Sequence, residues 1–217
     1  RWDDKRGAPN PDAEALKAAM LDGIRQLGLG ALPWSDELAK WRERVAFMRA
    51  QDESWPDLSD TALLATLQAW LAPFLDGVSR RDHLGRVDLA AALKALVPWD
   101  RQRELDRLVP THVEVPSGSR VSVDYSNPAE PSLSVRLQEM FGLSDTPRIA
   151  GGKVPLTIHL LSPARRPVQV TRDLASFWAT GYKSVKAELK GRYPRHYWPD
   201  DPLVAEPTAR VRRPRPR

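Results

Sequence analysis

The stretch from Thr146 to Pro202, TPRIAGGKVPLTIHLLSPARRPVQVTRDLASFWATGYKSVKAELKGRYPRHYWPDDP, decides the fold of the C-terminal half. Two apolar runs, residues 154–161 and 168–171, flank a loop rich in proline and arginine at residues 162–167. This composition predicts a strand, a loop and a second strand. Residues 174–178 and 182–189 are helical in composition, so we expect a helix that is broken or bent at Gly181.

Shorter segments before this stretch also alternate between apolar and polar residues. Residues 112–115 and 120–125 do so around Pro116-Ser117-Gly118-Ser119, which predicts a β-hairpin. We expect the hairpin and the two later strands to form one small antiparallel sheet. Apolar residues alternate from 133 to 137 but follow helical spacing at 137, 140 and 141. Both structures fit this segment, and the prediction is a helix that begins near Leu133.

Residues 1–110 have helical periodicity. Asn10-Pro11 predicts the start of a helix with an apolar face at positions 16, 20, 24 and 27. Ser35 starts a second helix with its face at positions 38, 41, 45 and 48, and Ser59 starts a third that ends near Gly77. Residues 88–97 and 100–109 predict two more. Trp34, Trp55 and Trp99 each border a proline, and we expect these rings to pack on neighbouring helix starts.

These patterns predict an α+β protein. A helical accessory domain of about five helices covers residues 1–110, and a small antiparallel sheet with helices covers residues 111–202. Residues 203–217 end in the run RVRRPRPR, whose prolines and scarce apolar surface predict a disordered basic tail.

Three segments together resemble the C-terminal region of HrpB-type DExH ATP-dependent helicases, a bacterial family. They are PSGSRVSVDYS (Pro116–Ser126), SVRLQEMFGL (Ser134–Leu143) and residues 146–202, and the resemblance extends back over LDGIRQLGLGALPWSDE at residues 21–37. It implies an accessory region that follows two motor lobes in the same polypeptide. Those lobes are the implied partner, and they would hold the ATP and Mg²⁺ of the parent protein.

The chain has no motor sequence of its own. A phosphate-binding loop needs the spacing G-x-x-x-x-G-K-[ST], and the near match at Gly152-Lys153 has Pro147 in place of the first glycine and Val154 in place of the hydroxyl residue. No Asp-Glu-x-His box occurs. We therefore expect no catalytic residue and no cofactor in this chain, whereas the parent protein would resemble an NTP-hydrolysing helicase.

Charge is distributed unevenly along the 217 residues. Residues 1–110 carry 16 Lys and Arg against 18 Asp and Glu, whereas residues 111–217 carry 17 against 10. The basic second half favours a polyanionic partner. The absence of cysteine excludes disulfides and thiolate metal sites. Without a signal-peptide pattern or an apolar run of about 18 residues, we expect a cytoplasmic protein that does not enter membranes.

Metal binding is not favoured by the sequence. The four histidines, at positions 83, 112, 159 and 196, lack the spacing of zinc ligands. His159 lies in an apolar run and is expected to be a hydrogen-bonded sheet residue. Asp200-Asp201 fits either a site for a hard cation or a solvated turn between prolines, and the turn is favoured.

Aromatic rings alternate with cations in the last helix and beyond it. Rings can stack on unpaired bases while lysine and arginine contact phosphates, so this pattern predicts binding of RNA or another single-stranded nucleic acid. The same lysines at helical spacing also fit an ordinary solvated helix face. The candidate residues are Trp178, Tyr182, Lys183, Lys186, Lys190, Arg192, Tyr193 and Arg195, with Arg165 and Arg166 in the strand–strand loop and Arg148 and Lys153 in the glycine-rich turn.

Two functions therefore stay open. The first is an accessory module that holds a single strand for the helicase motor. The second is a protein-docking module that packs on the motor lobes or on a partner protein, with no specific nucleic-acid site. No heptad pattern is sustained, and a monomer is the expected state.

Overall fold

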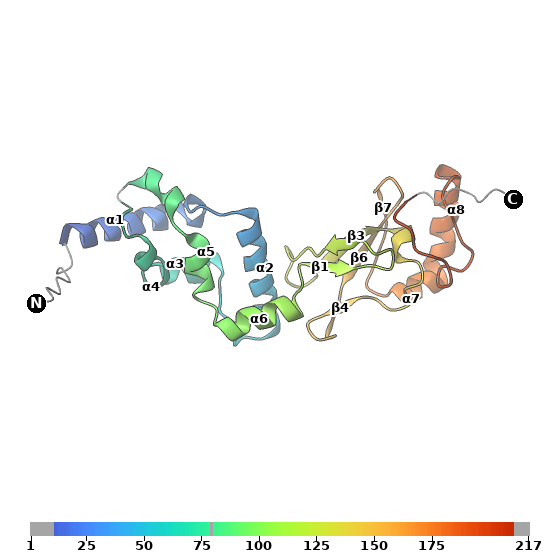
Figure 1. Ribbon diagram of the computed structural model, residues 1–217, viewed down its shortest axis with the longest axis horizontal. Coiled ribbons are helices and arrows are strands. Elements are labelled where there is room, and N and C mark those ends of the chain that lie inside the picture. Colours follow the sequence, from blue (N-terminus) through green and yellow to red (C-terminus); the bar gives the residue numbers. More distant parts are fainter. Residues whose placement is uncertain (1–10, 79, 211–217) are drawn as a thin grey trace, which may run out of the picture. The chain divides into compact units, whose positions relative to one another are not determined.

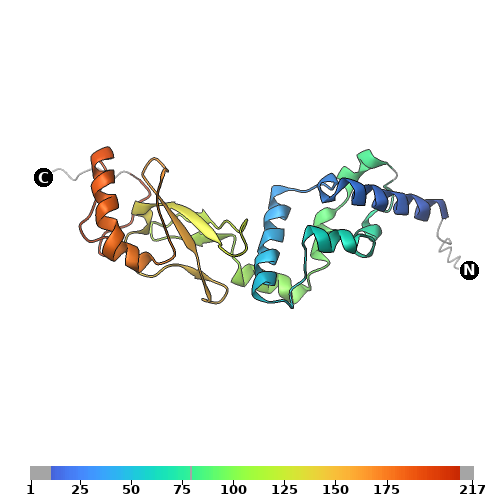
Figure 2. The same cartoon turned by 180° about the vertical axis from the view of Figure 1, so that it is seen from behind.

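A computed structural model describes residues 11–78 and 80–210. The chain divides into two compact units, residues 1–104 and residues 105–217. Helices form the first unit, and strands together with helices form the second (Figure 1; reverse side in Figure 2). This is the predicted α+β class. The division falls within α6 (Trp99–Leu108), ahead of the change of periodicity at Pro110.

Helix α2 illustrates how the helical unit follows from its sequence. The Ser35 hydroxyl accepts a hydrogen bond from the Leu38 amide at 3.1 Å, which caps the helix. The predicted apolar face at positions 38, 41, 45 and 48 is buried, as expected. The elements of this unit are α1 (Pro11–Leu27), α2 (Asp36–Gln51), α3 (Asp60–Ala65), α4 (Leu67–Leu71), α5 (Leu89–Lys94), the first part of α6, and the 3₁₀ helices η1 (Leu29–Ala31), η2 (Ala72–Phe74) and η3 (Arg81–Arg86).

The third predicted helix is wrong as one continuous element, because the chain breaks at Thr66 between α3 and α4. The Thr66 hydroxyl donates to the Ala62 carbonyl at 2.8 Å, and the Thr66 backbone leaves the helical region at φ −113° and ψ 20°. A threonine that bonds back to the preceding turn bends a helix. Leu63, Leu67 and Leu71 are buried on both sides of the break, so the two pieces keep one apolar face.

Two other predictions for the helical unit need correction. In α1, Leu21 and Ile24 are buried, whereas Leu16 is 39% and Leu27 48% exposed. Positions 17, 20, 21 and 24 form an equally regular stripe, so spacing alone did not select the buried face. Trp99 is 72% exposed rather than packed, although Trp55 is buried as expected.

Among its described residues, the second unit contains three small β-sheets instead of the single antiparallel sheet that was predicted. Strand β6 lies in the middle of the largest sheet, parallel to β3 and antiparallel to β7. The connection over residues 137–156 is long enough for a parallel crossover. The strands are β1 (His112–Glu114) with β2 (Arg120–Ser122), β3 (Ser132–Arg136) with β6 (Thr157–Leu161) and β7 (Pro167–Thr171), and β4 (Arg148–Ile149) with β5 (Val154–Pro155).

The segment that fitted both a strand and a helix is a strand where a helix was predicted. Residues 132–136 form β3, and the 3₁₀ helix η4 (Leu137–Met140) follows. Leu133 and Val135 are buried, and Leu133 is paired with Ile158 of β6. The segment forms a strand because its backbone pairs with β6 and its alternating apolar side chains, Leu133 and Val135, are buried in the core.

The last helical region is irregular at Gly181, as predicted. It consists of α7 (Leu174–Ser176), a π-helical turn, η5 (Phe177–Gly181), and α8 (Tyr182–Arg192). A Cβ at Gly181 would meet Phe177 Cδ2 at 2.8 Å, so the close approach of that ring requires glycine. Phe141, Trp178 and Tyr182 pack with Phe177 in one aromatic cluster.

Residues 203–210, which the sequence analysis assigns to the tail, contact the rest of the second unit. Ala205 is buried, and the Thr208 amide donates to the Gln138 carbonyl at 3.1 Å. Just before this segment, the Gly142 amide donates to the Pro202 carbonyl at 2.8 Å. These contacts with the core compensate for the cost of ordering a polar segment. Residues 211–217 lie outside the described residues.

Candidate nucleic-acid interface

Two of the predicted stacking rings are not available to a ligand. Trp178 and Tyr182 are 6% and 1% exposed. The Trp178 indole donates to the Leu143 carbonyl at 2.7 Å, and the Tyr182 hydroxyl donates to the Pro199 carbonyl at 2.7 Å. Burial raises the pKa of the Tyr182 phenol. Both residues are internal anchors, because a ring that already satisfies its polar atom inside the protein presents no face for a base.

The turn between β6 and β7 presents two arginines to solvent. The Arg165 amide donates to the Ser162 carbonyl at 2.8 Å, and the Ser162 amide donates to the Arg166 carbonyl at 2.8 Å. Arg165 has φ +62°. In a three-residue hairpin loop this left-handed position is usually glycine. A charged side chain at a position that favours glycine points to a role for the side chain rather than for the backbone.

This turn contacts the end of α8. Ser162 Oγ lies 3.4 Å from the Tyr193 hydroxyl, although the two residues are 31 positions apart. The Tyr193 ring is half-buried and meets the His196 ring edge to face at 6.0 Å. Figure 1 shows the β6–β7 turn beside the C-terminal end of α8. We call this region the turn–helix patch, formed by Arg165, Arg166, Arg192, Tyr193 and Arg195.

The arginines of the turn–helix patch are exposed. Arg192 has one weak partner, Glu188, at 4.0 Å. Within the described part of the chain, the side chains of Arg165, Arg166 and Arg195 have no recorded hydrogen bond or ion pair. The four guanidinium groups are therefore available to anions, and guanidinium groups bind phosphate oxygens well.

The lysines of α8 differ from one another. Lys183 and Lys190 are exposed, whereas Lys186 is ion-paired with Asp200. The hydrogen bond from Lys186 lowers the pKa of the Asp200 carboxyl, and the charge of Lys190 adds to this effect. We call Lys183, Lys186 and Lys190 the lysine face of α8. Asp200 pairs with this face, which its proline-flanked sequence context did not predict.

The last two candidates lie away from the patch. Arg148 and Lys153 flank the β4–β5 turn, where Ala150, Gly151 and Gly152 all have positive φ. In Figure 1 this turn lies at the end of the second unit opposite to the β6–β7 turn. The predicted residues therefore do not form one continuous surface.

Arg136 is a further cation, close enough for its charge to act on His196. Arg136 donates to Glu139 at 3.3 Å, and this buried carboxylate also accepts from Ser117 at 3.0 Å and Ser119 at 2.6 Å. Burial and, to a lesser extent, the charge of Arg136 lower the pKa of His196. Glu139 thereby fixes the β1–β2 hairpin and a positive charge near His196. No local pattern signals this, because its members are distant in sequence.

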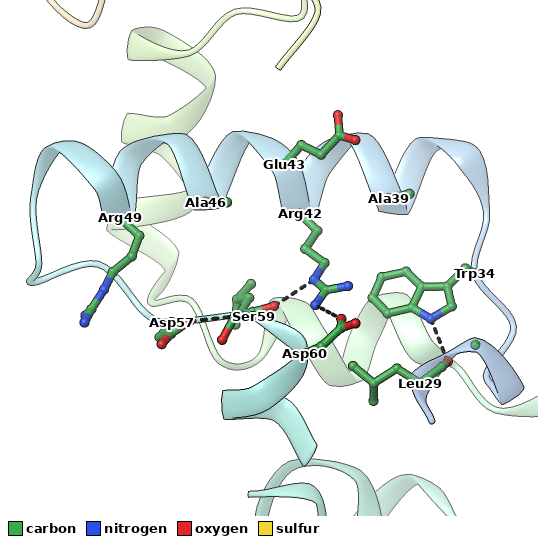
Figure 3. A pocket seen from close by; sticks show the side chains of 12 residues that line it. Leu29, Trp34, Ala39, Arg42, Glu43, Ala46, Arg49, Asp57, Ser59 and Asp60 are labelled. Carbon is green, nitrogen blue, oxygen red and sulfur yellow. Dashed lines mark hydrogen bonds and ion pairs between the residues drawn. The ribbon is translucent and has the colours of Figure 1, made fainter. Parts of the chain in front are cut away.

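The helical unit contains a groove of about 560 Å³ along α2 (Figure 3). Its basic groups are already bonded internally. Arg42 donates to the Leu58 carbonyl at 2.7 Å, pairs with Asp60 and lies 5.0 Å from the centre of the Trp34 ring. Arg49 donates to the Trp55 carbonyl at 3.0 Å. These arginines stabilise the helical unit and present no free set of groups for chemistry.

Within residues 11–78 and 80–210, no cluster of three or more His, Cys, Asp or Glu side chains has the geometry of a metal site. None of the helices there combines the length and the apolar character that crossing a bilayer requires. His159 is a half-buried residue of β6.

Comparison with known proteins places the chain in a class of helicase-associated regions. Residues 70–202 match the family model described as ATP-dependent helicase C-terminal. The chain belongs to this family, the HrpB C-terminal family. It is 45% identical over 205 residues to the ATP-dependent RNA helicase HrpB of Escherichia coli strain K12, covering 94% of this chain and 25% of the relative.

Solved structures agree with this assignment. A crystal structure of the E. coli DExH-box NTPase HrpB matches with a TM-score of 0.80 and 44% identity, over 94% of this chain and 25% of that one. A crystal structure of the E. coli DEAH/RHA helicase HrpB matches with a TM-score of 0.68 and 42% identity, over 89% of this chain and 24% of that one. The chain thus spans about a quarter of the length of these relatives.

Proposed function

We propose that this chain is an accessory part of an ATP-dependent RNA helicase and that it holds a single strand of nucleic acid at the turn–helix patch. The motor lobes of the parent polypeptide would bind ATP and Mg²⁺, and this part would have no ATPase activity of its own. It would act in the cytoplasm, as one copy linked to its motor lobes. Support comes from the relatives, one of which is named an RNA helicase.

One observation carries the nucleic-acid proposal. The contact between Ser162 and Tyr193 joins the β6–β7 turn to the end of α8, and so brings together two segments that carry four exposed arginines. The second unit as a whole has 18 Lys and Arg against 11 Asp and Glu. Phosphates of a flexible strand can meet these arginines, and Tyr193 and the neighbouring Tyr197, which is 41% exposed, offer ring surface to bases.

Salt-dependent binding tests this proposal. Each phosphate contact on a single strand adds about 0.7 to the slope of log affinity against log salt, so four arginines predict a slope of about −3. The measurement is fluorescence anisotropy of a labelled oligouridine, titrated with the chain and with a version that ends at Arg210. Binding that survives this truncation would belong to the described residues and not to residues 211–217.

A pair of matched variants locates the site. Arg165→Asn with Arg166→Gln removes two charges from the patch, and asparagine tolerates the left-handed backbone at position 165. Arg148→Gln with Lys153→Gln removes two charges from the β4–β5 turn. We expect the first variant to lose affinity on the order of tenfold at about 0.1 M salt, and the second to lose much less. Equal losses of affinity in the two variants would refute the assignment of the binding site to the turn–helix patch.

The exposed Trp99 ring favours a second candidate function. It is 72% exposed at the start of α6. Exposed aromatic rings are common in protein interfaces, so the docking role on the motor lobes or on a partner protein remains an alternative. A chain that binds no oligouridine at low salt, yet loses its association with the motor lobes on Trp99→Ala, would favour docking.

A further inference from the structure

The Lys186–Asp200 pair has an asymmetric geometry. The Lys186 side chain is 18% exposed, whereas the Asp200 side chain is fully exposed. Lys190, one turn further along α8, is close enough for its charge to act on the same carboxylate.

The backbone that carries Asp200 is held in place along α8. The Tyr182 hydroxyl donates to the carbonyl of Pro199, the residue before Asp200. The Trp198 indole donates to the Tyr193 carbonyl at 2.9 Å, so the segment after α8 is fixed at its start as well. Two buried aromatic side chains therefore anchor the segment that delivers one carboxylate to the lysine face.

The Asp200 carboxylate, paired with Lys186, occupies the position that a phosphate of a bound strand would take. We propose that Asp200 is an intramolecular competitor for this phosphate position, an inference that rests on the proposed binding of nucleic acid by this unit. Bound nucleic acid displaces the carboxylate from Lys186 and gains one phosphate contact next to the turn–helix patch. In the free protein, the Asp200 carboxylate occupies Lys186 in place of a phosphate.

The Lys186–Asp200 pair favours polyanionic ligands over ligands that bring a single carboxylate. A single carboxylate from an acidic protein competes poorly, because Asp200 is the same chemical group at a high effective concentration. A nucleic acid that already contacts the arginines brings its next phosphate at a comparable effective concentration. Exposed ion pairs between lysine and aspartate are weak, so this exchange is readily reversible. The lysine face then adds to affinity only for a ligand with several closely spaced charges.

The test compares Asp200→Asn with Asp201→Asn in the anisotropy titration with oligouridine. Both substitutions remove one negative charge, and asparagine at position 201 retains the acceptor for the Leu203 amide. We expect Asp200→Asn to raise affinity about fivefold at about 0.1 M salt, because the strand then contacts Lys186 without first breaking an ion pair. Asp201→Asn should change affinity less than twofold, by its general charge effect alone.

A double-mutant cycle ties the effect to Lys186. Lys186→Gln should change affinity little in the wild-type background, because there the phosphate contact only replaces the ion pair with Asp200, and it should abolish the gain in the Asp200→Asn background. Equal gains from Asp200→Asn and Asp201→Asn, or a gain that persists with Lys186→Gln, would overturn the inference. If wild type binds and the arginine variant loses binding, such a result leaves the proposed function standing. Absence of any binding by wild type would overturn both.

Discussion

The two units use arginine in opposite ways. In the helical unit, Arg42 and Arg49 bind backbone carbonyls, and Arg101 lies 4.9 Å from the centre of the Trp55 ring and donates to Ser54 at 2.8 Å. In the second unit, Arg165 and Arg166 extend from a turn into solvent. Arginine thus stabilises the fold at these positions of the helical unit and provides exposed charge in the β6–β7 turn. Net charge alone would not separate these two uses.

The largest expected effect concerns the aromatic residues of the second unit. Trp178→Ala should destabilise this unit by about 3–5 kcal/mol, because it leaves a cavity in the aromatic cluster and an unpaired Leu143 carbonyl. Amide hydrogen exchange, followed separately in residues 11–104 and 105–210, measures it. Faster exchange should be confined to the second unit. Normal exchange with lost oligouridine binding would mean that Trp178 is a stacking residue after all.

The next effect tests the structural role of arginine in the helical unit. Arg42→Ala should destabilise that unit by about 2 kcal/mol, since it removes a hydrogen bond to Leu58 and the stack on Trp34. Its oligouridine affinity should not change. Lys40→Ala, at an exposed position on the same helix, is the matched control and should be nearly neutral. A loss of affinity in Arg42→Ala without destabilisation would reverse the roles assigned to the two units.

A smaller effect follows from His196. Its pKa is lowered in the folded state, so the folded protein binds fewer protons than the unfolded chain near the ordinary histidine pKa of about 6.5. Its contribution to stability is fully present above that pH and is lost as the pH falls. Urea denaturation between pH 7.5 and 5.5 should therefore show decreasing stability of the second unit. His196→Gln should reduce this dependence.

The smallest effect on stability, and the sharpest contrast, is expected at Arg165. Arg165→Gly places glycine at a left-handed position, which relieves strain but increases the entropy of the unfolded chain. The net change should lie within about 1 kcal/mol, with a slight gain favoured. Oligouridine affinity should nevertheless fall. A Tm that drops together with affinity would show that Arg165 supports the fold instead of a ligand.

The sequence predicted those parts of the fold that depend on local signals. Ser35 and Ser59 marked helix starts, and the proline-rich loop marked the β6–β7 turn. The break at Thr66 was missed because both halves keep one apolar face. Strand β3 was missed because its partner β6 lies in a distant part of the chain, and pairing between strands outweighs local propensity.

The candidate site was predicted only in part, for a similar reason. Exposed arginines were identified from their loop, but the contact of Ser162 with Tyr193 spans 31 positions and has no local signal. Trp178 and Tyr182 were assigned to the surface because rings that alternate with lysines fit a stacking surface. The same spacing also suits an amphipathic helix, and Tyr182, Val185 and Leu189 form its buried face.

The most direct test of the central claim is an NMR titration of the isotope-labelled chain with oligouridine. We predict that amide signals of residues 162–166 and 192–196 shift most, with progressive changes that disappear at high salt. Signals of the helical unit and of the β4–β5 turn should stay in place. Shifts centred on the groove along α2 or on Arg148 and Lys153, or no shifts at low salt, would contradict the turn–helix patch as the nucleic-acid interface.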